Sequence, residues 1–233
     1  MNSNALEIKQ ELETHQEFLK ANFFAVLWDI FAVKVDTMRG NTARAYKRGK
    51  CYQNHTPTSI FKHWLHNYFF NDAETLRQLE EGTNFELIHA SAVDGLKRFW
   101  EEKEAGIEGM AYYHYAKLID LLFKSVARWD KLSEERRLWF FEHVNVPLDK
   151  YSLLILREFN PNYHIPAPSM NFVKDKEHYD KIQKDIREMI APFSPLLFDL
   201  YAWDYRRRNQ IISEEKFELI DAMISDGAAL TKK

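Results

Sequence analysis

The sequence predicts an all-α fold, and three observations lead to this prediction. Apolar residues recur at spacings of three and four through most of the 233 residues, which is the period of an amphipathic helix. Only 7 glycines and 7 prolines occur, so turns are few and elements are long. No segment alternates apolar and polar residues over the length of a typical strand. We therefore expect a single all-α globular domain over residues 1–233, with about eight to eleven helices.

The N-terminal half contains clear helix starts and stops. Residues 4–35 fit one or two helices, because their apolar positions follow the helical period. Thr56 and Pro57 open the next helix, since threonine caps helices and proline suits the first helical position. Asp72 starts a further helix, which Gly82 ends.

The C-terminal half continues the same pattern. A helix from about Phe85 to Lys103 is followed by a strong helical run, MAYYHYAKLIDLLFKSVARW, at 110–129. Ser133 provides a capped start for the next helix. Asp149 is well placed to cap a helix that begins at about Lys150, because carboxylates favour the N-terminal turn. Beyond it we expect a proline-rich loop at 159–172. Three more helices should follow, at 175–191, from Pro195 onward and at 213–225.

Composition limits the classes of protein that remain. The net charge is −3, so binding to nucleic acid needs a local basic patch. The single cysteine, Cys51, excludes an intramolecular disulfide and fits a reducing compartment. No apolar run approaches the roughly 18 residues of a membrane span, and the N-terminus lacks a signal-peptide core. A cytoplasmic location without membrane association is therefore expected.

One local basic patch occurs at residues 36–50. Four of its cations are Arg39, Arg44, Lys47 and Arg48. Tyr46 lies among them, and such a mixture suits contacts to nucleic-acid phosphates. The alternative is an ordinary solvated loop.

A lysine in an apolar helical stripe is the most informative feature of the 110–129 run. Lys117, Leu121 and Lys124 are spaced i, i+4 and i+7, so they share one helix face beside an apolar surface. A lysine in such a place can act as an amine nucleophile and form a Schiff base. The alternative is that Lys117 is exposed, that Asp120 pairs with Lys124, and that Asp149 only caps a helix.

Two short motifs resemble the helix-hairpin-helix DNA glycosylases, with the 8-oxoguanine branch nearest. KLID at 117–120 resembles that family's Lys-Val-Ala-Asp, in which a catalytic lysine begins a helix. VPLD at 146–149 resembles its Val-Pro-Val-Asp, in which a catalytic aspartate lies at a helix N-terminus. The resemblance covers residues 110–157. The glycines of the family's Leu-Pro-Gly-Val-Gly hairpin are absent, because YHYA at 113–116 stands there.

The resemblance implies excision of a damaged or modified base from DNA without a cofactor. Lys117 would attack the sugar C1′ atom, and Asp149 would act as its partner. The base would be flipped out of the helix. The phosphates would be held by Arg39, Arg44, Lys47, Arg48 and Lys124. The other hypothesis is a non-catalytic helical module that binds nucleic acid or protein.

Other chemistries find little support in the sequence. Cys51, His55, His63 and His66 do not follow a standard zinc spacing, so we expect surface or hydrogen-bonded histidines and no metal. There is no nucleophile elbow, phosphate-binding loop or dinucleotide fingerprint. Hydride transfer and nucleoside-triphosphate hydrolysis are therefore not expected.

Overall fold

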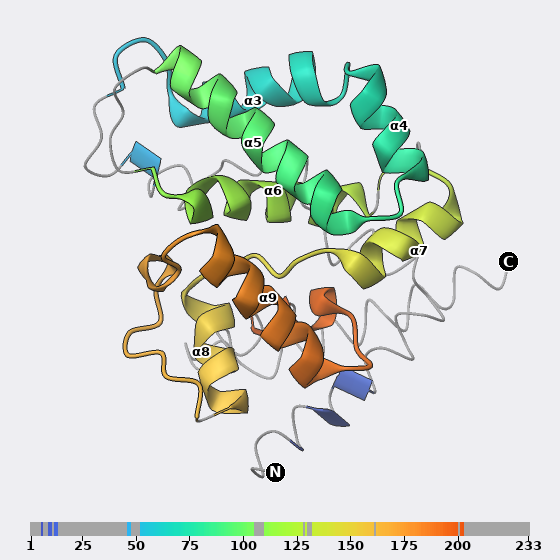
Figure 1. Cartoon of the computed structure of the whole chain (residues 1–233), viewed down its shortest axis with the longest axis vertical. Helices are drawn as coiled ribbons and strands as arrows, with labels where there is room; N and C mark the ends of the chain where they lie inside the picture. Colours follow the sequence, from blue (N-terminus) through green and yellow to red (C-terminus); the bar gives the residue numbers. More distant parts are fainter. Residues whose placement is uncertain are drawn as a thin grey trace, which may run out of the picture. The chain divides into compact units, whose positions relative to one another are not determined.

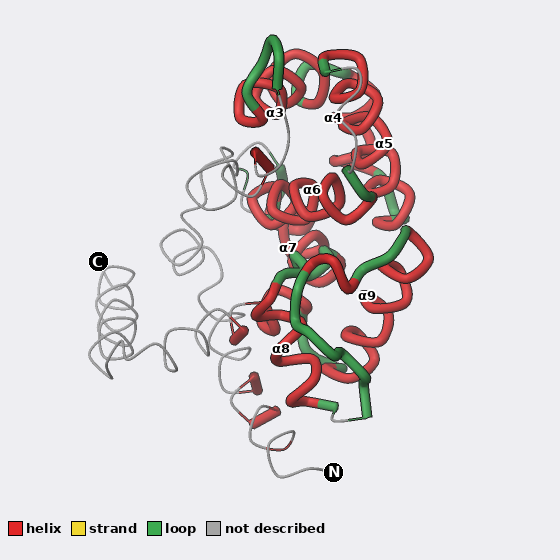
Figure 2. Tube along the Cα trace, turned by 90° about the vertical axis from the view of Figure 1, so that its left-hand side faces the viewer, coloured by secondary structure: helices red, strands yellow, loops and turns green. Residues whose placement is uncertain are grey.

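A computed structural model describes most of the chain between Tyr52 and Ala202. The described residues are 6, 9–10, 12–13, 46–47, 52–104, 110–127, 129, 132–160, 162–199 and 201–202. They form helices and loops and include no strand (Figure 2), so the predicted all-α class is confirmed for this part of the chain.

The chain divides into two compact units. We call residues 33–147 with 173–180 the middle unit, and residues 1–32, 148–172 and 181–233 the terminal unit. Each unit is described by itself below.

The middle unit is a set of packed helices (Figure 1). After α3 the chain passes through a π-helix and α4, and α5 then returns to pack against α3. Helix α6 packs against α5, and α7 packs against α6. The elements are α3 (Pro57–Trp64), the π-helix η1 (Leu65–Phe69), α4 (Ala73–Glu81), α5 (Phe85–Lys103), α6 (Tyr112–Val126) and α7 (Glu134–His143).

The predicted helix starts in this unit are confirmed by side-chain caps. The Thr56 hydroxyl accepts a hydrogen bond from Ser59 N, and Ser59 Oγ accepts one from Thr56 N, which makes a capping box ahead of α3. Asp72 accepts from Thr75 N at the start of α4. Ser133 accepts from Arg136 N at the start of α7.

The π-helix was not predicted. The run SIFKHWLHNYFF at 59–70 reads as one apolar helix, but its second half forms η1, in which Phe70 N donates to Leu65 O at 3.0 Å. This is the wider i→i+5 bond of a π-turn, which is rare and often found at functional sites.

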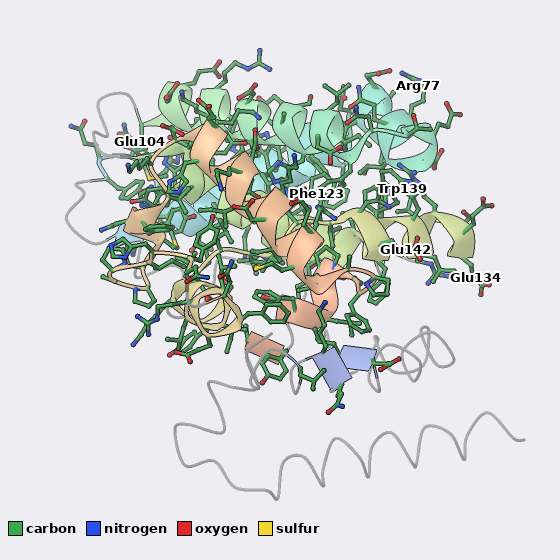
Figure 3. All side chains as sticks on the ribbon, turned by 60° about the horizontal axis from the view of Figure 1, so that its bottom comes forward. Arg77, Glu104, Phe123, Glu134, Trp139 and Glu142 are labelled. Carbon is green, nitrogen blue, oxygen red and sulfur yellow. The ribbon has the colours of Figure 1, made fainter. Side chains whose placement is uncertain are left out.

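Aromatic side chains form the core of the middle unit. The Phe123 ring stacks on Phe140 with 5.8 Å between centroids and meets the edge of Phe85 at 5.3 Å. All three are buried, and Figure 3 shows Arg77 and Glu134 at the periphery, away from Phe123. Each buried phenylalanine stabilises the fold by about 1.5–3 kcal/mol relative to an exposed one.

The terminal unit contains α8 (Lys150–Phe159), the 3₁₀ helix η2 (Met170–Phe172) and the later residues of α9 (Lys176–Ile190). Asp149 caps α8, as predicted. Residues 195–199 and 201–202 are helical, which confirms the start of the helix expected after Pro195. The Lys181 ammonium lies 5.5 Å from the centre of the Tyr163 ring in the preceding loop.

Two predictions fall outside the described residues: most of the helices expected at 4–35 and the last helix at 213–225. Among the residues that the structure describes, no helix combines the length and apolar character that crossing a bilayer requires.

Candidate functional site

Helix α6 carries two of the residues that the sequence singled out. Lys117 is half-buried, and Asp120, one turn later, is fully buried. Lys117 is the sixth residue of α6, whereas the glycosylase resemblance expects the lysine to begin its helix. The local position of Lys117 beside apolar surface agrees with the helical pattern.

Asp120 is the centre of a buried polar cluster in the middle unit. Its Oδ1 atom lies 2.8 Å from His89 Nε2 on α5 and accepts a 2.6 Å hydrogen bond from the Tyr179 hydroxyl. Because a carboxylate oxygen only accepts, we assign the imidazole proton to Nε2. The amide of Asn145 donates to the Tyr179 oxygen at 3.1 Å. We call these four residues the Asp120 cluster.

Ring packing holds the Asp120 cluster in place. The Tyr179 and His89 rings stack with centroids 5.7 Å apart and planes 9° apart. Tyr112 meets Tyr179 edge-on at 5.5 Å. This packing fixes both donors toward one carboxylate oxygen, and the other oxygen, Asp120 Oδ2, is buried without a hydrogen-bond partner among the described residues.

The surroundings shift two pKa values in this cluster. Burial raises the pKa of the Asp120 carboxyl, while the hydrogen bonds from His89 and Tyr179 and the charge of Lys117 oppose that shift. Burial and the neighbouring carboxylate raise the pKa of Tyr179 well above its ordinary value. The Tyr179 hydroxyl therefore keeps its proton and donates to Asp120, and burial outweighs the groups that lower the pKa of the Asp120 carboxyl.

The sequence did not identify the partners of Asp120. The pairing of Asp120 with Lys124, which belonged to the alternative interpretation, does not occur, because the carboxylate bonds to His89 and Tyr179 instead. The sequence contains one signal for the pair of His89 and Asp120: each is a polar residue on the apolar face of its helix. Their separation of 31 residues gives no period that identifies them as partners.

Asp149 opens α8 in the terminal unit. Its Oδ1 accepts hydrogen bonds from Tyr151 N at 2.8 Å and Ser152 N at 3.1 Å, and Ser152 Oγ accepts from Asp149 N at 2.8 Å. This capping box confirms the predicted cap. Lys117 belongs to the middle unit, so the joint site that the resemblance implies stays a prediction.

The predicted phosphate-binding residues are described only in part. Lys47 is exposed, directly after the buried Tyr46. Lys124 is 7% exposed, so little of it is accessible to a DNA backbone. Arg39, Arg44 and Arg48 lie outside the described residues.

The histidines considered for zinc are exposed at positions 55, 63 and 66. The His63 ring packs edge-on against Phe99 at 5.4 Å. No group of three or more His, Cys, Asp or Glu residues suited to a metal ion occurs in the described part of the chain, which does not include Cys51.

Comparisons with known proteins do not assign the chain to a class. Protein-family models, curated proteins and solved structures all give no significant match. Any functional hypothesis therefore depends on the residues and their geometry.

Proposed function

We propose that this protein is a DNA glycosylase-like enzyme that excises a damaged or modified base through Lys117 and Asp149. The observation that supports this most directly is local: the carboxylate of Asp149 caps α8 immediately after the Val-Pro-Leu segment. The motif resemblance requires an aspartate at a helix N-terminus in this position. A second support is the position of Lys117, which is half-buried on α6 one helical turn from the buried Asp120.

The proposed reaction uses one amine and one carboxylate. The unprotonated Lys117 Nζ attacks C1′ of the nucleotide, and the glycosidic bond breaks with its electron pair on the departing base. The base takes up a proton, while Asp149 stabilises the positive charge that develops on the sugar. The sugar ring then opens: O4′ gains a proton, and a protonated imine forms between Nζ and C1′. Water hydrolyses this imine and releases the lysine and an abasic sugar.

Borohydride trapping tests this proposal, because the reagent reduces the imine to a stable secondary amine. Duplex oligonucleotides, each with one lesion, are incubated with protein and borohydride, and a covalent adduct is sought by denaturing gel. The set includes 8-oxoguanine, uracil, hypoxanthine, an alkylated purine and an abasic site. We expect an adduct with at least one lesion and none with undamaged DNA.

Two matched variants separate chemistry from folding. Lys117→Arg keeps the positive charge beside Asp120 but lacks the nucleophilic amine, so it should abolish the adduct at an unchanged melting temperature. Asp149→Asn keeps a good helix cap and removes the charge, so it should slow the reaction by about a hundredfold or more. Adducts at wild-type yield in Lys117→Arg would overturn the proposal.

A non-catalytic helical binding module is the second candidate. The hydrogen bonds of Asp149 favour this candidate. Its Oδ1 atom accepts from two backbone N–H groups, so helix capping alone is enough to explain an aspartate at this position. Absence of an adduct over the whole lesion set, with retained binding to undamaged DNA or to protein, would support this candidate.

A further inference from the structure

A pocket in the middle unit is lined by neither Lys117 nor Asp149. Its volume is about 490 Å³, and it is bounded by the end of α3, η1, the start of α4 and the middle of α5. That volume falls in the range of small-molecule sites. Aromatic residues from α3, η1 and α5 contribute to its walls: Trp64, Tyr68 and Phe99.

Tyr68 offers a flat aromatic surface to a ligand, whereas Trp64 and Phe99 are buried in the wall behind it. The Tyr68 and Phe99 rings lie 4.9 Å apart at 50°, and Tyr68 is 51% exposed. An aromatic side chain that stays so exposed at the rim of a pocket is available to stack on a planar ring.

Trp64 supplies a hydrogen-bond donor without an acceptor. This residue is buried, and no other described residue accepts a hydrogen bond from its indole N–H. The Nε1 atom itself is not among the fully buried polar atoms that lack a partner, so its N–H is open to an acceptor on a ligand.

Gly95 keeps the space beside that donor open. A Cβ built on Gly95 would lie 3.7 Å from Trp64 Nε1, which is ordinary van der Waals contact. Packing therefore does not require a glycine here, although glycine is unfavourable in the interior of a helix such as α5. An alanine at position 95 would instead fill part of the pocket beside the indole N–H of Trp64.

The rim of the pocket supplies hydrogen-bond acceptors. The side-chain amide of Asn67 donates to His63 O at 3.1 Å, and that of Asn71 donates to His66 O at 2.6 Å. Both amides thus use their NH₂ groups on the backbone, which leaves each Oδ1 as an acceptor. Glu102 adds a carboxylate.

The charges at the rim select against anions. Two carboxylates, Asp72 and Glu102, line the pocket with one cation, Arg98. A ligand that suits this setting is planar, carries no negative charge, and has at least one hydrogen-bond acceptor and at least one N–H donor. Purine and pyrimidine rings have all of these properties.

We propose that this pocket binds a neutral nitrogen heteroaromatic ring of the nucleoside class. The ring stacks against Tyr68, accepts from Trp64 Nε1 and donates to the amide and carboxylate oxygens of the rim. The π-turn at 65–69 supports this assignment, because such turns are rare and occur often at functional sites. The proposal is independent of the glycosylase proposal, since neither Lys117 nor Asp149 lines the pocket.

Nuclear magnetic resonance on the full-length ¹⁵N-labelled protein tests this proposal. Adenosine, guanosine and uridine are titrated separately, with ribose as a control that lacks the ring. The indole N–H signal of Trp64, assigned by its loss in Trp64→Phe, reports on the donor directly. We expect a saturable shift of this signal with at least one nucleoside and none with ribose.

Gly95→Ala separates binding from folding. The added methyl group should weaken nucleoside binding by about tenfold or more, while the melting temperature stays equal or rises because alanine favours the helix. Lys97→Ala, on the same helix but outside the pocket, should bind as wild type does. Absence of a saturable shift with all three nucleosides, or wild-type affinity in Gly95→Ala, would overturn the proposal.

Discussion

The hydroxyl of Tyr179 donates a 2.6 Å hydrogen bond to Oδ1 of Asp120, although 59 residues separate the two in the sequence. Oxygen–oxygen hydrogen bonds to a carboxylate are short and about twice as strong as neutral ones. This bond joins the first turn of α9 to α6 within the middle unit. His89 adds a contact from α5 to the same oxygen, so one atom links three helices.

Removal of the Asp120 carboxylate should therefore destabilise the protein severely. Asp120→Ala leaves the Tyr179 hydroxyl and the His89 N–H without their acceptor, and we expect a loss of about 3 kcal/mol or more in unfolding free energy. Asp120→Asn retains an acceptor oxygen and removes the buried charge, so its loss should be smaller. Urea unfolding measures both, and equal losses would contradict the proposed role of the Oδ1 acceptor.

Glu104 makes part of the stability dependent on pH. Its carboxylate accepts hydrogen bonds from three successive backbone N–H groups, those of Gln53 (3.1 Å), Asn54 (3.0 Å) and His55 (2.6 Å). Burial raises the pKa of Glu104, but these N–H groups and the charge of His55 together outweigh it and lower the pKa below 4.5. Because the folded protein then binds this proton less readily than the unfolded chain, the stabilisation is present above 4.5. It is lost as pH falls through the lower folded value.

The variant Glu104→Gln isolates this effect. At neutral pH it should cost about 1–3 kcal/mol of unfolding free energy, because the amide cannot satisfy all three donors and carries no charge. The difference between wild type and variant should shrink as the solution is acidified below 4.5. A difference that stays constant with pH would show that Glu104 is not ionised in this contact.

Arg136 should resist replacement by lysine. Its guanidinium donates through Nε to Leu79 O and through Nη2 to Gln78 O at 3.2 Å, which satisfies carbonyls near the end of α4. It also lies 3.8 Å from the centre of the Trp139 ring. Lysine has neither the planar fork nor the stacking surface.

We therefore expect Arg136→Lys to lose about 1–3 kcal/mol in chemical denaturation. Arg77→Lys, on the exposed face of α4, is the control and should change stability by no more than about 0.5 kcal/mol. A similarly small loss in Arg136→Lys would mean that charge alone matters at position 136.

Gly82 and Gly95 should respond oppositely to alanine. A Cβ on Gly82 would lie 2.5 Å from Gln78 O and 2.7 Å from Ile88 Cδ1, which forces the backbone to shift. The Gly82 φ angle of −63° suits any residue, so the cost comes from crowding and should be about 1–3 kcal/mol. Gly95→Ala has room for its methyl group and should raise the melting temperature slightly. Equal melting temperatures for the two variants would contradict this reading of Gly82.

The starts of the helices could be predicted because the signals are local. Thr56 and Asp149 cap their helices with side chains that reach only two or three residues ahead. A cap therefore needs no information from the rest of the chain. The helical spacing of the apolar residues in α6 likewise predicts that Lys117 lies beside an apolar surface.

Local sequence signals account for the helical class, most helix starts in the described part of the chain and the capping role of Asp149, because propensity, period and caps act over a few residues. Long-range packing, in contrast, sets the π-turn at 65–69, the partners of Asp120 and the pocket beside Trp64. The partners of Asp120 lie 31 and 59 residues away. The π-turn has the same apolar pattern as an α-helix, and packing decides between them. Such features arise when distant segments meet and exclude water, which no local pattern records.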